Sequence, residues 1–115
     1  MANVLDKIIE DKKNSLKGIK KTNSLDSIEN KIKSLNNFLN FKEVITNNKG
    51  ISLIAEIKKA SPSAGELVKD FNHLNIAKMY LENGATCLSV LTEEKHFLGK
   101  LDYIRDIKNN FKIPV

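Results

Sequence analysis

Two ionisable residues of opposite charge, Glu56 and Lys58, stand two positions apart at the end of a short apolar run, residues 51–57. Side chains alternate along a strand, so these two point to one face while Ala55 and Ile57 point to the other. The apolar pair suits a face covered by helices. An acid and an amine brought together on the opposite face are costly unless they pair or act on a ligand. They are therefore candidates for acid–base chemistry, and a structural ion pair or a solvated strand end is the alternative.

A Ser61-Pro62-Ser63 sequence follows the candidate pair closely. Proline fixes its own φ and restricts the residue before it, so this loop is expected to be stiff beside the site. An ordinary turn is the other interpretation. The preceding Lys58-Lys59 lacks the glycine spacing of a nucleotide-binding loop.

Three other reactive side chains carry less weight. His73 and His96 have no second ligand at metal spacing, and both are predicted to be surface residues. Cys87 falls inside a predicted buried strand, where an inert thiol is expected rather than a nucleophile.

The periodicity of apolar residues divides the chain into two regions. Residues 4–48 repeat apolar side chains at spacings of three and four, which predicts helices with a polar break at 20–23. Asn40 and Glu43 have the spacing of a capping box before a short last helix. From Ile51 the pattern becomes strand 51–57, helix 72–82, strand 86–91, a helix carrying Leu101, Ile104 and Ile107, and the start of a third strand at 113–115.

Strand and helix alternating in this way are typical of a parallel α/β sheet with right-handed crossovers. We expect the N-terminal portion of a TIM (β/α)8 barrel, in which residues 1–49 form a helical extension and residues 50–115 supply two βα units and the start of strand three. Because a closed barrel needs roughly 250 residues, the barrel here is incomplete and the chain is expected to be part of a longer protein. Active sites of such barrels lie at the C-terminal ends of the strands, where Glu56 and Lys58 fall.

Composition limits the remaining classes of function. The 115 residues are 41% hydrophobic and 29% charged, which is ordinary for a soluble globular protein. A single cysteine, no secretory signal and no membrane-length apolar stretch predict a cytoplasmic protein without a membrane partner.

The formal net charge of +5 raises the question of a nucleic-acid partner. Ten lysines face six acids in residues 1–50, and they lie opposite the apolar stripes of helices, where solvated charge is the default. Arg105 is the single arginine in the sequence, although arginine is the residue best suited to base and phosphate contacts. We therefore expect no nucleic-acid partner.

Two motifs in this sequence resemble those of the indole-3-glycerol phosphate synthase family. Residues 54–63, Ile-Ala-Glu-Ile-Lys-Lys-Ala-Ser-Pro-Ser, resemble the family signature I-A-E-x-K-x-x-S-P-S. Residues 89–99, Ser-Val-Leu-Thr-Glu-Glu-Lys-His-Phe-Leu-Gly, resemble its second block, S-V-L-T-x-x-x-x-F-x-G. The N-terminal helices match the extension that the family carries ahead of its barrel. Lys100 is a departure, because a small residue is common after that glycine.

The resemblance implies a reaction and roles for particular residues. The family closes an indole ring on 1-(2-carboxyphenylamino)-1-deoxyribulose 5-phosphate, with loss of carbon dioxide and water and without a metal or organic cofactor. Lys58 resembles a lysine that contacts the substrate carboxylate and has acid roles, and Glu56 resembles a glutamate of the acid–base relay. The residues that match the substrate-binding positions are Ser61, Pro62, Leu91 and Phe97.

The resemblance also places essential parts after Val115, namely a third-strand lysine, a fourth-strand glutamate and the late phosphate-binding loops. The 115 residues alone are therefore expected to be inactive as a carboxy-lyase. Two alternatives stay open: another phosphate-binding barrel enzyme, such as a relative of phosphoribosylanthranilate isomerase, and a non-catalytic interaction module. Self-association that covers the open sheet edges is a further expectation.

Overall fold

A computed structural model describes residues 3–115 and divides the chain into two compact units, residues 1–38 and 39–115. In the part of the chain that the structure describes, every helix is too short or too polar to span a bilayer. The predicted division into residues 1–49 and 50–115 concerns the barrel and its extension and stays a prediction.

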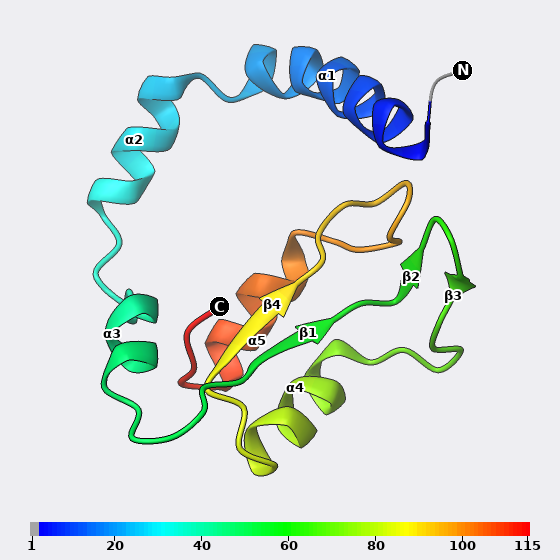
Figure 1. The fold of residues 1–115 in the computed structure, drawn as a ribbon. Helices are drawn as coiled ribbons and strands as arrows, with labels where there is room; N and C mark the ends of the chain where they lie inside the picture. Colours follow the sequence, from blue (N-terminus) through cyan, green and yellow to red (C-terminus); the bar gives the residue numbers. More distant parts are fainter. Residues whose placement is uncertain (1–2) are drawn as a thin grey trace. The chain divides into compact units, whose positions relative to one another are not determined.

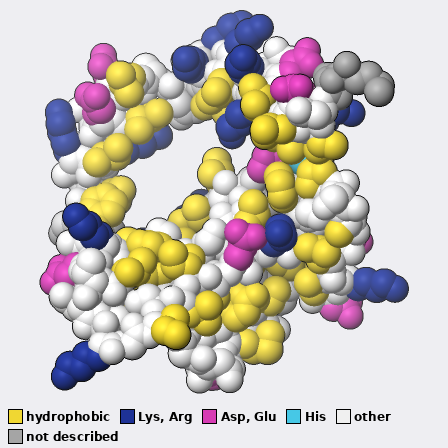
Figure 2. All heavy atoms as spheres, in the orientation of Figure 1, with side chains coloured by type: hydrophobic (Ala, Val, Ile, Leu, Met, Phe, Trp, Pro, Cys, Tyr) yellow, Lys and Arg dark blue, Asp and Glu magenta, His cyan; other side chains and the backbone are white. Residues whose placement is uncertain are grey.

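The first unit contains helices α1 (Val4–Thr22) and α2 (Leu25–Lys33). Both begin at a polar N-cap. The Asn3 side chain accepts a hydrogen bond from the Asp6 amide while the Asp6 carboxylate accepts one from the Asn3 amide, and Ser24 caps α2. Neither helix contains a buried residue, and Figure 2 shows apolar side chains exposed along both, with lysines beside them. Two amphipathic helices are therefore present as predicted, but α1 continues to Thr22, through most of the predicted break, and α2 ends at Lys33, before Leu35 and Leu39 of the predicted apolar stripe.

The second unit is built on two parallel strands, β1 (Ile54–Ile57) and β4 (Cys87–Val90), which run side by side in Figure 1. Glu56 is paired in register with Ser89, and Ile57 with Val90. The ladder continues for one bond beyond β4, because the Leu91 amide donates to the Ile57 carbonyl at 3.1 Å. The predicted first strand, 51–57, is too long at its start by three residues.

Helices α4 (His73–Glu82) and α5 (Asp102–Asn110) contribute to the core that covers one face of this strand pair. The face presents Ala55, Ile57 and Leu88, and it packs against Ala77 of α4 and Ile107 of α5. The alternation within β1 is therefore as predicted, with Ala55 and Ile57 buried and Ile54 and Glu56 exposed. Burial of these apolar side chains stabilises the β1–α4–β4–α5 arrangement.

Helix α3 (Phe41–Thr46) belongs to the second unit and lies at the N-terminal ends of the strands. Asn40 caps it by accepting a hydrogen bond from the Glu43 amide at 3.0 Å, which is the asparagine half of the predicted capping box. The Ser52 hydroxyl donates to the Ile45 carbonyl at 3.2 Å and ties the helix to the segment before β1. The candidate residues lie at the opposite end of the strand pair, at the C-terminal ends of β1 and β4.

Two further local features differ from their prediction. The loop after β1 contains a small antiparallel hairpin, β2 (Ala60–Ser61) with β3 (Gly65–Glu66), which Gly65 permits with φ +67°. Residues 113–115 do not form a strand. They lie beside β4 through one bond, from the Leu88 amide to the Pro114 carbonyl at 2.9 Å, and a proline has no amide to extend such a ladder.

The prediction that His73 is a surface residue is wrong. Its Nε2 lies 2.9 Å from Oδ2 of Asp106, and its ring stacks on Tyr103 with centroids 4.4 Å apart. The side chain is 19% exposed. His73 therefore links the start of α4 to α5, and its sequence position at a helix start gave no indication of this partner 33 residues away.

We expect Asp106→Asn to lower the free energy of unfolding by about 1 kcal/mol, because it weakens a charge-assisted hydrogen bond between α4 and α5. Glu82→Gln is the control. It removes an exposed carboxylate 3.9 Å from Lys78, a pair of the kind worth about 0.5 kcal/mol or less. Urea denaturation measures both variants, and equal midpoints for the two would contradict a special role for the His73–Asp106 link.

Candidate active site

The carboxylate of Glu56 and the ammonium of Lys58 form an ion pair at the C-terminal end of β1. Oε1 of Glu56 lies 3.2 Å from Nζ of Lys58, and the side chains are 47% and 34% exposed, respectively. Both belong to the face opposite the helices, because the alternate positions Ala55 and Ile57 are buried. The predicted pairing of an acid and an amine on one face is therefore observed.

Ser89 is a third member of this group, and sequence reasoning did not select it as a site residue. Its hydroxyl donates to Oε2 of Glu56 at 3.4 Å. The contact follows from the parallel register, which places Ser89 directly beside Glu56 on the neighbouring strand. A serine two residues before Leu91 in the second motif was the signal that could have identified it.

The backbone of Glu56 is fixed as well. The Tyr80 hydroxyl, from α4, donates to the Glu56 carbonyl at 2.9 Å. One strand therefore carries a side chain that faces away from the helices and a carbonyl that is held by a helix. Such support restricts the movement of the carboxylate without occupying either of its oxygens.

Ser61 and Pro62 lie in the hairpin that follows Lys58. The Ser61 hydroxyl accepts a hydrogen bond from the Ala64 amide at 3.2 Å and lies 3.5 Å from the hydroxyl of Ser63. Pro62 is exposed at the turn. The structure thus gives Ser61 a local turn contact, and the predicted contact of both residues with a substrate stays a prediction.

Leu91 and Phe97 belong to the segment that follows β4. The bond from the Leu91 amide to Ile57 extends the parallel register by one residue, which places Leu91 beside Lys58. Phe97 is partly buried, and its amide donates to Oε2 of Glu93 at 3.0 Å. Leu91 therefore lies at the C-terminal ends of the two strands, and the predicted contacts of both residues with a substrate stay predictions.

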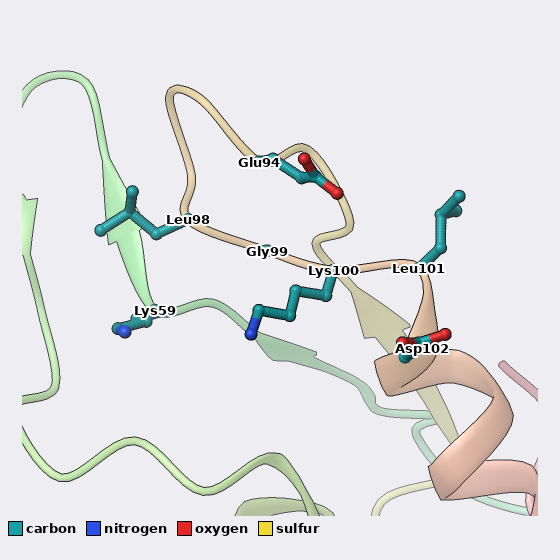
Figure 3. A pocket seen from close by; sticks show the side chains of 7 residues that line it. All are labelled: Lys59, Glu94, Leu98, Gly99, Lys100, Leu101 and Asp102. Atoms are coloured by element: carbon teal, nitrogen blue, oxygen red, sulfur yellow. The ribbon is translucent and has the colours of Figure 1, made fainter. Parts of the chain in front are cut away.

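An open cavity of about 560 Å³ lies next to this group, between the residue after Lys58 and the segment that leads into α5. Figure 3 shows the side chains of Lys59 and Lys100 on the same side of the segment that contains Gly99. The other residues that line the cavity are Glu94, Leu98, Leu101 and Asp102. None of the six predicted site residues lines it, so we locate the candidate chemistry at the Glu56–Lys58 pair.

Within residues 3–115, no three His, Cys, Asp or Glu side chains are arranged to hold a metal ion. Cys87 is fully buried in β4, as predicted, and burial raises the pKa of its thiol. The side chains that are in contact at the Glu56–Lys58 pair are a carboxylate, an ammonium and the hydroxyl of Ser89.

The model of the indole-3-glycerol phosphate synthase family matches residues 5–115. Three similar proteins are the indole-3-glycerol phosphate synthases of Clostridium acetobutylicum, Alkaliphilus metalliredigens and Desulforamulus reducens, which are 46%, 44% and 42% identical to this chain. The alignments cover 97% of this chain and 42–43% of those proteins, so the chain spans less than half the length of the curated relatives it matches. On these grounds the chain belongs to the indole-3-glycerol phosphate synthase family.

Proposed function

We propose that this segment supplies the first-strand acid–base pair of an indole-3-glycerol phosphate synthase. The observation that carries the proposal is the 3.2 Å contact between Glu56 and Lys58 at the C-terminal end of β1, in a chain of this family. The substrate is 1-(2-carboxyphenylamino)-1-deoxyribulose 5-phosphate, and the products are indole-3-glycerol phosphate, carbon dioxide and water.

The reaction needs an acid and a base at more than one step. A ring carbon attacks the ketone, and the oxygen that becomes negative must receive a proton. The carboxyl group then leaves as carbon dioxide, and the hydroxyl leaves as water after it is protonated. An ammonium beside a carboxylate can donate a proton and recover one, and it can also hold the carboxylate of the substrate by charge.

The geometry of the pair supports this division of roles. The Lys58 side chain is 34% exposed, so its ammonium can reach a ligand on the open face. Glu56 is held by Lys58 on one oxygen and by Ser89 on the other, and its carbonyl is held by Tyr80. We assign proton donation and carboxylate binding to Lys58, and orientation and proton relay to Glu56.

Substrate binding is assigned to Ser61, Pro62, Leu91 and Phe97. Phe97 supplies an apolar ring for the aromatic part of the substrate, and Leu91 lies beside Lys58 at the same end of the strands. In the full-length protein these residues line the C-terminal mouth of a (β/α)8 barrel, of which residues 50–115 form the first two βα units. The third-strand lysine and the phosphate-binding loops follow this segment in the proposed enzyme.

Turnover by two proteins tests the proposal. A full-length synthase that carries residues 1–115 is expected to form indole-3-glycerol phosphate, detected by its indole absorbance and by mass spectrometry. The 115-residue chain alone is expected to give no product above background, because the phosphate-binding loops and the third-strand lysine of the proposed enzyme belong to other residues. Product formed by the 115 residues alone, or no product from the full-length protein, would contradict the respective part of the proposal.

A further inference from the structure

One carboxylate organises the segment between β4 and α5. Glu93 accepts hydrogen bonds from three consecutive backbone amides: its Oε1 from Lys95 at 3.1 Å, and its Oε2 from His96 at 2.6 Å and from Phe97 at 3.0 Å. Its own carbonyl accepts a bond from the Gly99 amide at 2.8 Å. A single residue therefore accepts bonds from four backbone amides, those of Lys95, His96, Phe97 and Gly99.

The loop held in this way is tight and strained. Gly99 is buried against the backbone of Leu91, so the two ends of the loop touch. Leu98 has φ +52°, a left-handed conformation that a leucine rarely adopts and that costs about 1 kcal/mol or more. Such a conformation persists only where the surrounding contacts determine it, and the bonds to Glu93 are contacts of that kind.

The surroundings of Glu93 favour the ionised form of its carboxyl group. Burial raises the pKa of the carboxyl, but the bonds from the amides of His96, Phe97 and Lys95, together with the charge of His96, outweigh burial and bring the pKa below its ordinary value. The carboxylate form is therefore favoured in the folded protein. Its stabilising contribution is present above the pKa of an unfolded glutamate and is lost as the pH falls through the folded value.

We propose that Glu93 is a positioning residue for the aromatic part of the substrate, acting through the backbone of Phe97. This inference deepens the proposed function and rests on it. Glu93 does not need to touch the substrate. It holds the backbone of Phe97 in a loop whose two ends, Leu91 and Gly99, are in contact next to the C-terminal end of β4.

A carboxylate is required here for a chemical reason. Three N–H donors converge on two oxygen atoms, and both oxygens accept. Glutamine has nearly the same shape but offers one oxygen and one NH2 group, so it leaves at least one backbone donor facing another donor. Glu93→Gln therefore changes the hydrogen bonding with little change in volume.

The first test measures the loop itself. A full-length synthase that carries residues 1–115 is labelled with 15N-phenylalanine, and the Phe97 amide signal is identified by its loss in Phe97→Leu. We expect this amide proton far downfield at neutral pH, because it donates to a carboxylate, and we expect it to move upfield in Glu93→Gln. In the unmodified protein it is expected to titrate with a midpoint below that of an ordinary glutamate, a measurement that does not require the variant to fold.

The second test measures substrate binding. For Glu93→Gln we expect KM to rise about tenfold while kcat falls less than about threefold, because a group that fixes a binding residue affects ground state and transition state alike. In a Phe97→Ala background the same substitution is expected to change KM less than about twofold, since two residues that act as a unit are not additive. Glu82→Gln, which removes an exposed carboxylate from α4, is expected to leave both constants unchanged.

The outcomes separate this inference from the proposed function. An inactive unmodified enzyme would refute the function, whereas the Phe97 amide signal would still show whether Glu93 holds the loop. A Phe97 amide that does not respond to Glu93 overturns the inference even in an active enzyme. So does a KM effect of Glu93→Gln that persists in full after Phe97→Ala.

Discussion

Lys58→Met in a full-length synthase that carries this segment is expected to lower kcat/KM by about 10³-fold, within the usual range for loss of a general acid. The methionine keeps much of the length and apolar volume of the lysine stem but has no proton to give. It also removes the positive charge that faces Glu56 at 3.2 Å and that would hold the substrate carboxylate. Steady-state assay of indole-3-glycerol phosphate formation measures the loss.

Lys78→Met is the matched control for this experiment. Lys78 lies on the solvent side of α4, is 64% exposed and contacts Glu82 at 3.9 Å. The Lys78→Met variant loses the same charge from the same unit of the protein. We expect its kcat/KM to stay within about twofold of that of the unmodified enzyme, as is usual for a surface substitution. A decrease in kcat/KM of less than about tenfold for Lys58→Met would show that Lys58 is not a catalytic residue.

Glu56→Gln distinguishes a working pair from a structural one. If the two groups act together, Glu56→Gln and Lys58→Met each cost nearly as much as the double variant, because removal of either partner disables the relay. If they form only a salt bridge at the surface, the substitutions change stability by about 1 kcal/mol or less and leave turnover nearly intact. The exposures of 47% and 34% make the stability term small in either case.

The parts of the fold that follow from local patterning were predictable from the sequence. The alternation in β1 placed Ala55 and Ile57 on the buried face and Glu56 on the open one. The N-cap residue before α3 is Asn40, at the position that the predicted capping box gave it. These features depend on residues within one or two turns of each other, so a single sequence contains the information.

Contacts that depend on register or on distant partners were missed. Ser89 meets Glu56 because of the pairing of two strands 33 residues apart, and His73 meets Asp106 because α4 and α5 pack together. Glu93 was missed for a different reason. In the second motif it looks like an ordinary charged loop residue. Its role depends on hydrogen bonds from three backbone amides, which converge on its carboxylate only in the folded loop.

Gly99→Ala is the substitution with the largest expected effect on stability. A Cβ at this position would stand 2.2 Å from the carbonyl oxygen of Leu91, 2.7 Å from its carbonyl carbon and 2.9 Å from Cα of Thr92. All three atoms belong to the backbone, so no side chain can rotate to make room. We expect the free energy of unfolding to fall by about 3 kcal/mol, at the upper end of the cost of overpacking.

Gly18→Ala provides the opposite case within the same chain. Gly18 lies inside α1 with nothing within 4 Å of its added Cβ, and alanine in a helix interior is favoured over glycine by about 0.5–1 kcal/mol. In urea denaturation of the full-length protein, we expect the midpoint to rise for Gly18→Ala and to fall for Gly99→Ala at unchanged m-value.

The loop geometry explains why Gly99→Ala is expected to affect substrate binding as well as stability. To relieve the contact with Leu91, the chain must move at Gly99, and the bond from its amide to the Glu93 carbonyl at 2.8 Å must lengthen. Glu93 also holds Phe97 through the adjacent amides, so the displacement is expected to raise KM in the same direction as Glu93→Gln. A Gly99→Ala enzyme with a lowered urea midpoint but an unchanged KM would show that the loop transmits no positional constraint to Phe97.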